Sequence, residues 1–158
     1  MRICFVCLGN IVRSPLAENL FRHLVEEREI DEEYEVDSAG TSAFHVGEAP
    51  DGRMRSVARE RGLFYSGKAR QFTRTDFNNF DLILAMDREN KEVLSSLAAS
   101  EEQRQKIRLL REFDPRADGE LDVPDPYYGG IDGFHDVYDL VERSILGLLE
   151  VLEHDRNS

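Results

Sequence analysis

The hydrophobic and polar positions of the chain alternate between short runs typical of buried strands and longer segments with the spacing of amphipathic helices. Strand-like runs occupy residues 2–6 (RICFV), 34–38 (YEVDS), 81–85 (DLILA) and 107–110 (IRLL). Since helical patterns separate most of these runs, the order of elements predicts an α/β fold whose parallel sheet is covered by helices on both faces.

Three segments carry the helical pattern most clearly. The first starts at Ser14, and the second covers residues 51–62, where Gly62 ends it. The last segment forms one long apolar stripe, made of Phe134, Val137, Tyr138, Val141, Ile145, Leu148, Leu149 and Leu152. Because no internal repeat or linker interrupts this order, we expect a single domain over residues 1–158.

The composition argues against several classes of protein. Hydrophobic residues make up 41% of the chain, but no apolar run approaches the roughly 20 residues of a membrane span, so we expect a soluble protein without membrane contact. The opening MRICFV is too short for a signal peptide, and two cysteines give no disulfide framework, so we expect a cytoplasmic location where thiols stay reduced. The net charge of -12 argues against nucleic-acid partners, whose binding depends on Lys and Arg contacts to phosphate.

Three features that suggest other chemistry do not fit their context. Cys4 and Cys7 form a C-x-x-C motif, but three extended residues separate Cα atoms by roughly 10 Å, whereas a disulfide needs about 4.4–6.8 Å. Cys4 is therefore expected in the core. Residues 62–69 (GLFYSGKA) have the spacing of a nucleotide-binding loop, but they follow a helix and end in Ala69 instead of Ser or Thr. We expect no metal site, because the histidines are scattered at His23, His45, His135 and His154.

The segment CLGNIVRS, from Cys7 to Ser14, has the features of an anion-binding loop. It joins a strand to a helix, and ligands bind outside the carboxyl ends of parallel strands. We expect Ser14 to be the N-cap and Pro15 the first helical residue, so that the helix N-terminus faces the anion. The guanidinium of Arg13 binds two phosphate oxygens at once, which a lysine does not. The loop N–H groups expected to bind phosphate are those of Leu8, Gly9, Asn10, Ile11, Val12 and Arg13.

Cys7 is a candidate nucleophile in this loop. A helix N-terminus and a nearby arginine favour the thiolate over the thiol. A sulfur beneath a bound phosphorus is placed for in-line attack, which gives a phosphocysteine. Ser14 can donate its hydroxyl proton to that sulfur. The alternative is a cysteine that merely packs at the end of a strand.

A second catalytic group is expected in the turn-rich residues 114–130 (DPRADGELDVPDPYYGG). Asp125 lies between two prolines that restrict its backbone, and it can serve as the general acid for the leaving alcohol and then as the base for water. Tyr127 and Tyr128 are candidate walls for a flat aromatic substrate. On its own, the stretch DPYYGG is also compatible with an ordinary surface turn.

Together, the segments VCLGNIVRSPLAE, VDSAGTS, ARQFTRTDF, DLILAMD and DPYYGG resemble the low-molecular-weight protein tyrosine phosphatases, over nearly the whole chain. The resemblance implies a single three-layer domain, Rossmann-like or flavodoxin-like, with a four-stranded parallel sheet and a phosphate-binding loop after the first strand. It also implies hydrolysis of phosphotyrosine in proteins without a cofactor, with inorganic phosphate as product and inhibitor.

The resemblance also implies roles for individual residues. Asn10 and Ser38 match polar residues that hold the shape of the loop, and Phe44 and Tyr128 match walls of the cleft. Tyr127 and Tyr128 match tyrosines that are themselves phosphorylated in some members. The nucleophile, the phosphate-binding arginine, the thiolate-stabilising hydroxyl and the general acid and base correspond, in that order, to Cys7, Arg13, Ser14 and Asp125.

Two positions depart from the pattern of the family. Val12 stands where many members carry a second cysteine that forms a protective disulfide with the nucleophile, so we do not expect that protection here. Gly67 stands where some members place a histidine that orients the loop asparagine, so the support of Asn10 must differ.

Three alternative functions stay open at this point. Thiol-dependent arsenate reductases share the fold but relay electrons through further cysteines, which this chain lacks beyond Cys7. Arginine phosphatases carry a threonine at the position of Ile11, whose apolar side chain instead suits an aromatic ester. A non-catalytic phosphopeptide-binding module would keep the loop but would need neither Cys7 nor Asp125.

Overall fold

Four parallel strands form the centre of the fold in a computed structural model that describes all 158 residues. The strands lie in the order β2-β1-β3-β4, and their bounds are β1 (Arg2–Cys7), β2 (Glu35–Gly40), β3 (Leu82–Ala85) and β4 (Ile107–Leu109). After β1 the chain adds β2 on one side and then β3 on the other, so the direction of strand addition reverses at β1. Ligands of open α/β sheets bind at such a switch point, and the segment that follows Cys7 lies there.

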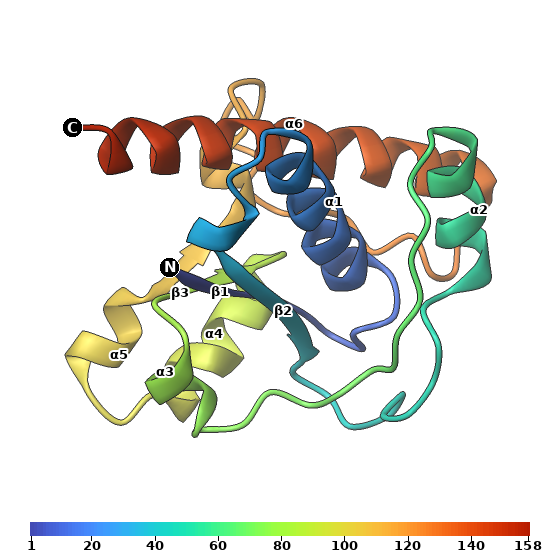
Figure 1. Cartoon of the computed structure of the whole chain (residues 1–158). Coiled ribbons are helices and arrows are strands. Elements are labelled where there is room, and N and C mark those ends of the chain that lie inside the picture. Colours follow the sequence, from blue (N-terminus) through green and yellow to red (C-terminus); the bar gives the residue numbers. More distant parts are fainter.

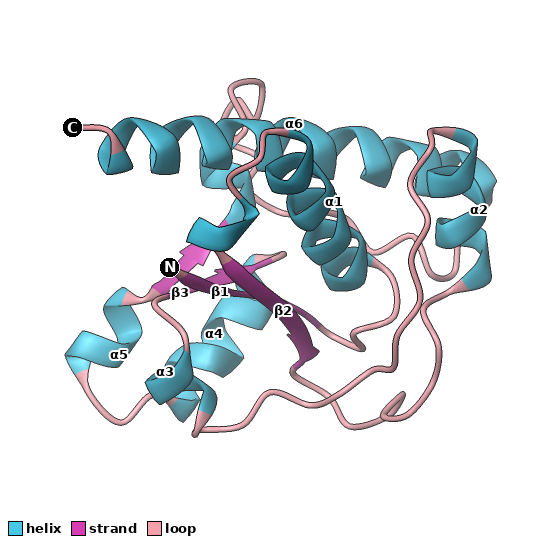
Figure 2. Cartoon of the chain, in the orientation of Figure 1, coloured by secondary structure: helices cyan, strands magenta, loops and turns pink.

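Helices cover both faces of the sheet and complete three layers (Figure 1; Figure 2). On one side lie α1 (Arg13–Glu27), α2 (Gly52–Glu60) and α6 (Ile131–Arg156). On the other side lie α3 (Asp76–Asn79), α4 (Arg88–Leu97) and α5 (Glu101–Gln105). Two short 3-10 helices complete the chain, η1 (Asp31–Glu33) and η2 (Leu110–Phe113). The predicted fold class is therefore confirmed.

Each outer layer has its own core, because successive side chains of β1 point to opposite faces of the sheet. Ile3 and Cys7 belong to the core of 27 buried residues that includes α1 and α6. Cys4 and Val6 belong to the core of 12 buried residues that includes α3 and α4. Both cysteines are free. The predicted core position of Cys4 is confirmed, and its thiol faces away from Cys7.

The expected strands and helices form with small shifts in their bounds. The long terminal helix extends beyond its apolar stripe at both ends, to Ile131 and Arg156. Helix α2 ends at Glu60, and Gly62 follows with φ +84°, a left-handed conformation common after helices. Residues 114–130 contain no helix or strand, as their turn-rich sequence predicts. None of the helices combines the length and the apolar character that crossing a membrane requires.

One expectation about helix α1 is wrong. The helix begins at Arg13, its N-cap is Val12 without a side-chain cap, and Pro15 is the third helical residue instead of the first. The Ser14 hydroxyl does not cap the helix because it lies 3.0 Å from Cys7 Sγ and accepts a hydrogen bond from Asn10 Nδ2 at 2.8 Å. Ser14 interacts instead with Cys7 and with the loop of residues 8–12, which is called the reactive loop from here on. These interactions have replaced the local cap.

Candidate active site

The loop of residues 8–12 joins β1 to α1 and passes close to the end of β2. Its carbonyl at Leu8 accepts a hydrogen bond of 2.9 Å from the N–H of Ser42. A Cβ at Gly40 would lie 2.7 Å from that same carbonyl oxygen, so only glycine permits this approach. Asn10 adopts φ +57°, a left-handed conformation that its short polar side chain tolerates. The end of β2 and this single left-handed residue give the loop its tight curvature.

Backbone donors in this loop are available to an anion. The N–H groups of Gly9, Ile11 and Val12 donate to no protein acceptor, although Ile11 and Val12 are buried. Buried donors are almost always paired in folded proteins. Together with the adjacent N-terminus of α1, they give the loop the donors that an oxyanion site requires.

Cys7 Sγ lies at the base of this loop and receives two polar contacts. The backbone N–H of Asn10 donates to the sulfur at 3.3 Å, and Ser14 Oγ lies 3.0 Å away. Asn10 Nδ2 donates to Ser14 Oγ at 2.8 Å and to Ser38 Oγ at 2.9 Å. The proton of Ser14 therefore has two acceptors within reach, the sulfur at 3.0 Å and the carbonyl of Ala39 at 3.4 Å, and the sulfur is the nearer one. A backbone donor and a hydroxyl thus both lie against the sulfur.

Arg13 is almost fully buried beside the loop, with 3% of its surface exposed. Its Nη1 donates to Asp87 Oδ2 at 2.6 Å and to the carbonyl of Val123 at 2.9 Å, and its Nη2 lies 3.6 Å from Asp125 Oδ2. Burial alone would lower the pKa of the guanidinium, but the neighbouring Cys7, Asp87 and Asp125 raise it above its ordinary value. The charge of Arg13 is therefore permanent, and Asp87 fixes its position.

Asp125 comes to the same place from a distant part of the chain. The loop that carries it is attached to the sheet by the N–H of Val123, which donates to the carbonyl of Met86 just after β3 at 2.7 Å. The N–H of Tyr127 donates to Asp125 Oδ1 at 3.0 Å, which leaves Oδ2 beside Arg13. The carboxyl is 39% exposed, so it is accessible from the pocket and from solvent.

These groups surround one pocket of about 550 Å³. Its rim is aromatic and largely open to solvent, since Phe44 is 84% and Tyr128 is 96% exposed. The lining residues are Cys7, Leu8, Gly9, Ile11, Val12, Arg13, Ser42, Phe44, His45, Asp125, Tyr127 and Tyr128. The side chains of the other three predicted residues, Asn10, Ser14 and Ser38, lie behind the loop backbone and support it through the hydrogen bonds described above. The structure thus brings all the predicted site residues together.

Sequence reasoning missed three residues of this site, which are Asp87 and the lining residues Ser42 and His45. Asp87 directly follows "LILAM" at the carboxyl end of β3, and an acidic residue in that position next to the predicted loop was the available signal. His45 was considered only as a metal ligand, but its ring forms part of the pocket wall and lies 5.8 Å from the ring of Tyr127. Its Nδ1 is 2.8 Å from Glu48 Oε2. No cluster of three His, Cys, Asp or Glu side chains has the geometry to hold a metal ion.

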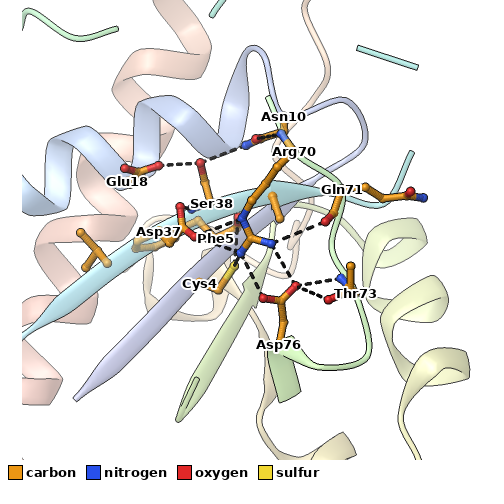
Figure 3. A network of polar contacts seen from close by, with 12 residues as sticks. Cys4, Phe5, Asn10, Glu18, Asp37, Ser38, Arg70, Gln71, Thr73 and Asp76 are labelled. Atoms are coloured by element: carbon orange, nitrogen blue, oxygen red, sulfur yellow. Dashed lines mark hydrogen bonds and ion pairs between the residues drawn. The ribbon is translucent and has the colours of Figure 1, made fainter. Parts of the chain in front are cut away.

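The two departures from the family pattern have different surroundings. Gly67 has φ +136°, and a Cβ placed there would meet no atom within 4 Å. Asn10 is held instead from the neighbouring segment, because its Oδ1 accepts a hydrogen bond of 3.0 Å from the backbone N–H of Arg70 (Figure 3). Val12 is buried at the pocket and carries no thiol.

Mild peroxide is expected to oxidise Cys7 beyond sulfenic acid to sulfinic or sulfonic acid. No neighbouring thiol is available to trap the sulfenic acid as a disulfide, because Val12 is apolar and Cys4 faces the other core. Peptide mapping by mass spectrometry measures the products, and Cys4→Ser should give the same oxidised Cys7. A Cys4–Cys7 disulfide as the main product would contradict this geometry.

Comparison with known proteins shows which family the chain belongs to. A family model described as low molecular weight phosphotyrosine protein phosphatase matches residues 2–158. The chain is 47% identical over 149 residues to the low molecular weight protein-tyrosine-phosphatase of Streptomyces coelicolor, covering 94% of this chain and 91% of that protein.

Solved structures show the same likeness. A protein tyrosine phosphatase from Entamoeba histolytica is similar with a TM-score of 0.93 and 40% identity, over 99% of each chain. A Drosophila arginine phosphatase is similar with a TM-score of 0.89 and 33% identity, over 96% of this chain and 98% of that one. The loop, the sheet order and these matches agree, and the chain belongs to the low molecular weight phosphotyrosine protein phosphatases, a family of hydrolases.

Proposed function

We propose that the protein hydrolyses phosphotyrosine in proteins, and small aryl phosphates, through a phosphocysteine on Cys7. The observation that carries the proposal is the convergence of the Cys7 sulfur, the Arg13 guanidinium and the Asp125 carboxyl on one pocket with an aromatic rim. A nucleophile, a cation for the phosphoryl oxygens and a group that moves protons are what phosphate monoester hydrolysis requires.

In the first step the thiolate of Cys7 attacks phosphorus. The S–P bond forms as the P–O bond to the phenol breaks, and Asp125 gives its proton to the departing phenolate oxygen. Arg13 and the loop N–H groups hold the three equatorial oxygens, where charge is shared in the transition state. Tyrosine leaves with its hydroxyl restored, and Asp125 is left as a carboxylate.

In the second step Asp125 accepts a proton from water as the water oxygen attacks phosphorus. The S–P bond breaks, the electron pair returns to Cys7, and inorganic phosphate is released. The Ser14 hydroxyl at 3.0 Å and the N–H of Asn10 at 3.3 Å stabilise the thiolate in both steps. Bound phosphate occupies the same donors, so it is expected to inhibit.

The aromatic rim of this pocket supports an aromatic substrate. Phe44, Tyr127 and Tyr128 offer flat apolar surface to a phenol ring, and Ile11 lines the pocket without a hydroxyl. The name of the Streptomyces relative supports the same substrate class. The similar Drosophila arginine phosphatase makes phosphoarginine the second candidate, because the likeness in fold alone does not separate the two.

Phosphotyrosine proteins are accordingly the proposed partners, in a reducing compartment such as the cytoplasm that keeps the Cys7 thiol free. Arsenate reduction is disfavoured because Cys4, the one other cysteine, is fully buried on the opposite face of β1. A binding module without turnover leaves the positions of Cys7 and Asp125 unexplained.

The test compares substrates under metal-free conditions, with a chelator present. We expect turnover of an aryl phosphate and of a phosphotyrosine peptide, slower release of phosphate from phosphoarginine, and no reduction of arsenate with a thiol reductant. Faster hydrolysis of phosphoarginine would establish the second candidate. Phosphate binding without any turnover would establish the binding module.

A further inference from the structure

The segment of residues 69–77 (ARQFTRTDF) lies beside the reactive loop and has no role in the chemistry described above. It runs along the carboxyl end of β2, where Gly40 N–H donates to the carbonyl of Arg70 at 2.9 Å and Phe72 N–H donates to the carbonyl of Gly40 at 2.7 Å. These bonds form an isolated parallel bridge next to β2. The segment is thereby held at the same edge of the sheet as the loop, as Figure 3 shows.

The backbone of Arg70 determines the orientation of the Asn10 side chain. Asn10 Oδ1 accepts from the N–H of Arg70 at 3.0 Å, and both protons on Nδ2 are donated, to Ser14 Oγ at 2.8 Å and to Ser38 Oγ at 2.9 Å. If the Asn10 amide were rotated by half a turn, its NH₂ group would face the N–H of Arg70. Two hydrogen-bond donors would then meet without an acceptor. The orientation that supplies a donor to Ser14 therefore depends on the position of Arg70.

The guanidinium of Arg70 in turn attaches its backbone to two other elements. It contacts Asp37 of β2 through Nε at 3.1 Å and Nη2 at 3.0 Å. It contacts Asp76 of α3 through Nη1 at 3.0 Å and Nη2 at 3.2 Å. Asp76 is 5% exposed and also accepts from the N–H of Thr73 at 2.7 Å. One planar fork thus joins Arg70 to β2 and to Asp76, where the segment enters α3 (Figure 3).

A lysine cannot make this set of contacts, because a single ammonium on a flexible stem does not present parallel donors to two carboxylates. Replacement of Arg70 by a neutral residue would leave the buried carboxylate of Asp76 with fewer partners, and the segment would keep its backbone bonds to Gly40 but lose the guanidinium contacts. The backbone N–H of Arg70 would then be held less firmly relative to Asn10.

We propose that Arg70 is a positioning residue for the active site, acting through its backbone N–H, the Asn10 amide and the Ser14 hydroxyl on the sulfur of Cys7. The inference rests on the proposed function of Cys7 as the nucleophile. It assigns the segment ARQFTRTDF the task of orienting the hydrogen bonds behind the reactive loop. A purely structural role would predict lost stability without a specific loss at the sulfur.

The test compares Arg70→Met and Arg70→Lys with the matched pair Arg143→Met and Arg143→Lys. Arg143 has similar exposure, 30% against 34% of the side chain, and it also makes a two-point contact with a buried carboxylate, with Nε and Nη2 each 3.2 Å from Asp114. Neither Arg143 nor Asp114 lines the pocket. Two rates are measured below the melting temperature of every variant: turnover of an aryl phosphate, and alkylation of Cys7 by iodoacetamide without substrate, located by peptide mapping.

We expect Arg70→Met to lose about tenfold in both rates, a modest share of what a misplaced catalytic group can cost. Arg70→Lys should lose less, and both Arg143 variants should retain the rates of the wild type even where their melting temperature falls. Equal rates in the Arg70 and Arg143 variants, whether retained or lost, would overturn the inference. Should Arg70→Met not fold, Arg70→Lys alone decides by the same comparison. If the wild type shows no turnover but the alkylation rate of Cys7 still falls in the Arg70 variants, the proposed function is refuted. The effect of Arg70 on the sulfur would then still stand.

Discussion

Replacement of Cys7 by serine is expected to abolish hydrolysis of aryl phosphates while phosphate binding survives. The loop N–H groups and Arg13 do not depend on the sulfur, so the anion site remains. The serine hydroxyl is not ionised near neutral pH and is a far weaker nucleophile than a thiolate. Loss of a nucleophile that works with a general acid typically costs on the order of 10⁴-fold or more in kcat.

Two measurements check this result on the same preparation. Release of phenol from an aryl phosphate gives the turnover, and the rise of the melting temperature with inorganic phosphate gives the retained binding. Cys4→Ser is the matched control, since it makes the same substitution on the opposite face of β1 and should keep turnover. Hydrolysis by Cys7→Ser well above the buffer rate would rule out the phosphocysteine.

Replacement of Asp125 by alanine is expected to slow the first step in proportion to the need of the leaving group for a proton. A positioned general acid contributes about 10²–10⁴ in rate, or roughly 3 to 5.5 kcal/mol of barrier. In the proposed mechanism the carboxyl has the required position, because Asp125 Oδ2 lies 3.6 Å from Arg13 Nη2, the group that would hold the phosphoryl oxygens. Phenols that are poor leaving groups should therefore lose the most.

Single-turnover phosphorylation of Cys7 by aryl phosphates of rising phenol pKa measures this dependence. Rates of Asp125→Ala should fall steeply along the series, whereas those of the wild type should stay nearly flat. Asp132→Ala is a suitable control, since Asp132 is an exposed carboxylate nearby in the first turn of α6 that does not line the pocket. If the rates of Asp125→Ala and of the wild type depend equally on phenol pKa, Asp125 is not the general acid and is only part of a surface turn.

Much of the fold was readable from the sequence because its elements are locally patterned. The runs at residues 2–6, 34–38, 81–85 and 107–110 became the four strands within one to two residues, and the apolar stripe near the C-terminus became α6. Helix α4 was not placed from the sequence, since few apolar residues mark it and only Asn90 and Leu94 are buried. Tertiary contacts decide such a helix more than its own pattern does.

The chain by itself determined the parts of the candidate site that are close in sequence. The eight residues from Cys7 to Ser14 contain the end of a strand, a loop with a glycine and the start of a helix. Local geometry therefore brings together the Cys7 sulfur, the loop N–H groups and the Arg13 guanidinium. The same local reasoning was wrong about Ser14, because the N-cap rule considers only the helix. In the structure the Ser14 hydroxyl contacts the sulfur of Cys7 and accepts a hydrogen bond from Asn10 instead.

Only the tertiary structure decided which distant groups join this loop. From the sequence alone, Asp125 was also compatible with a plain surface turn. In the structure, the hydrogen bond from Val123 N–H to the carbonyl of Met86 attaches its loop to the end of β3. Asp87 and Arg70 reach Arg13 and Asn10 across 74 and 60 residues of chain. The physical reason is that parallel strands bring their carboxyl ends to one edge of the sheet whatever their separation in sequence, and burial there selects the charge pairs that a linear pattern does not reveal.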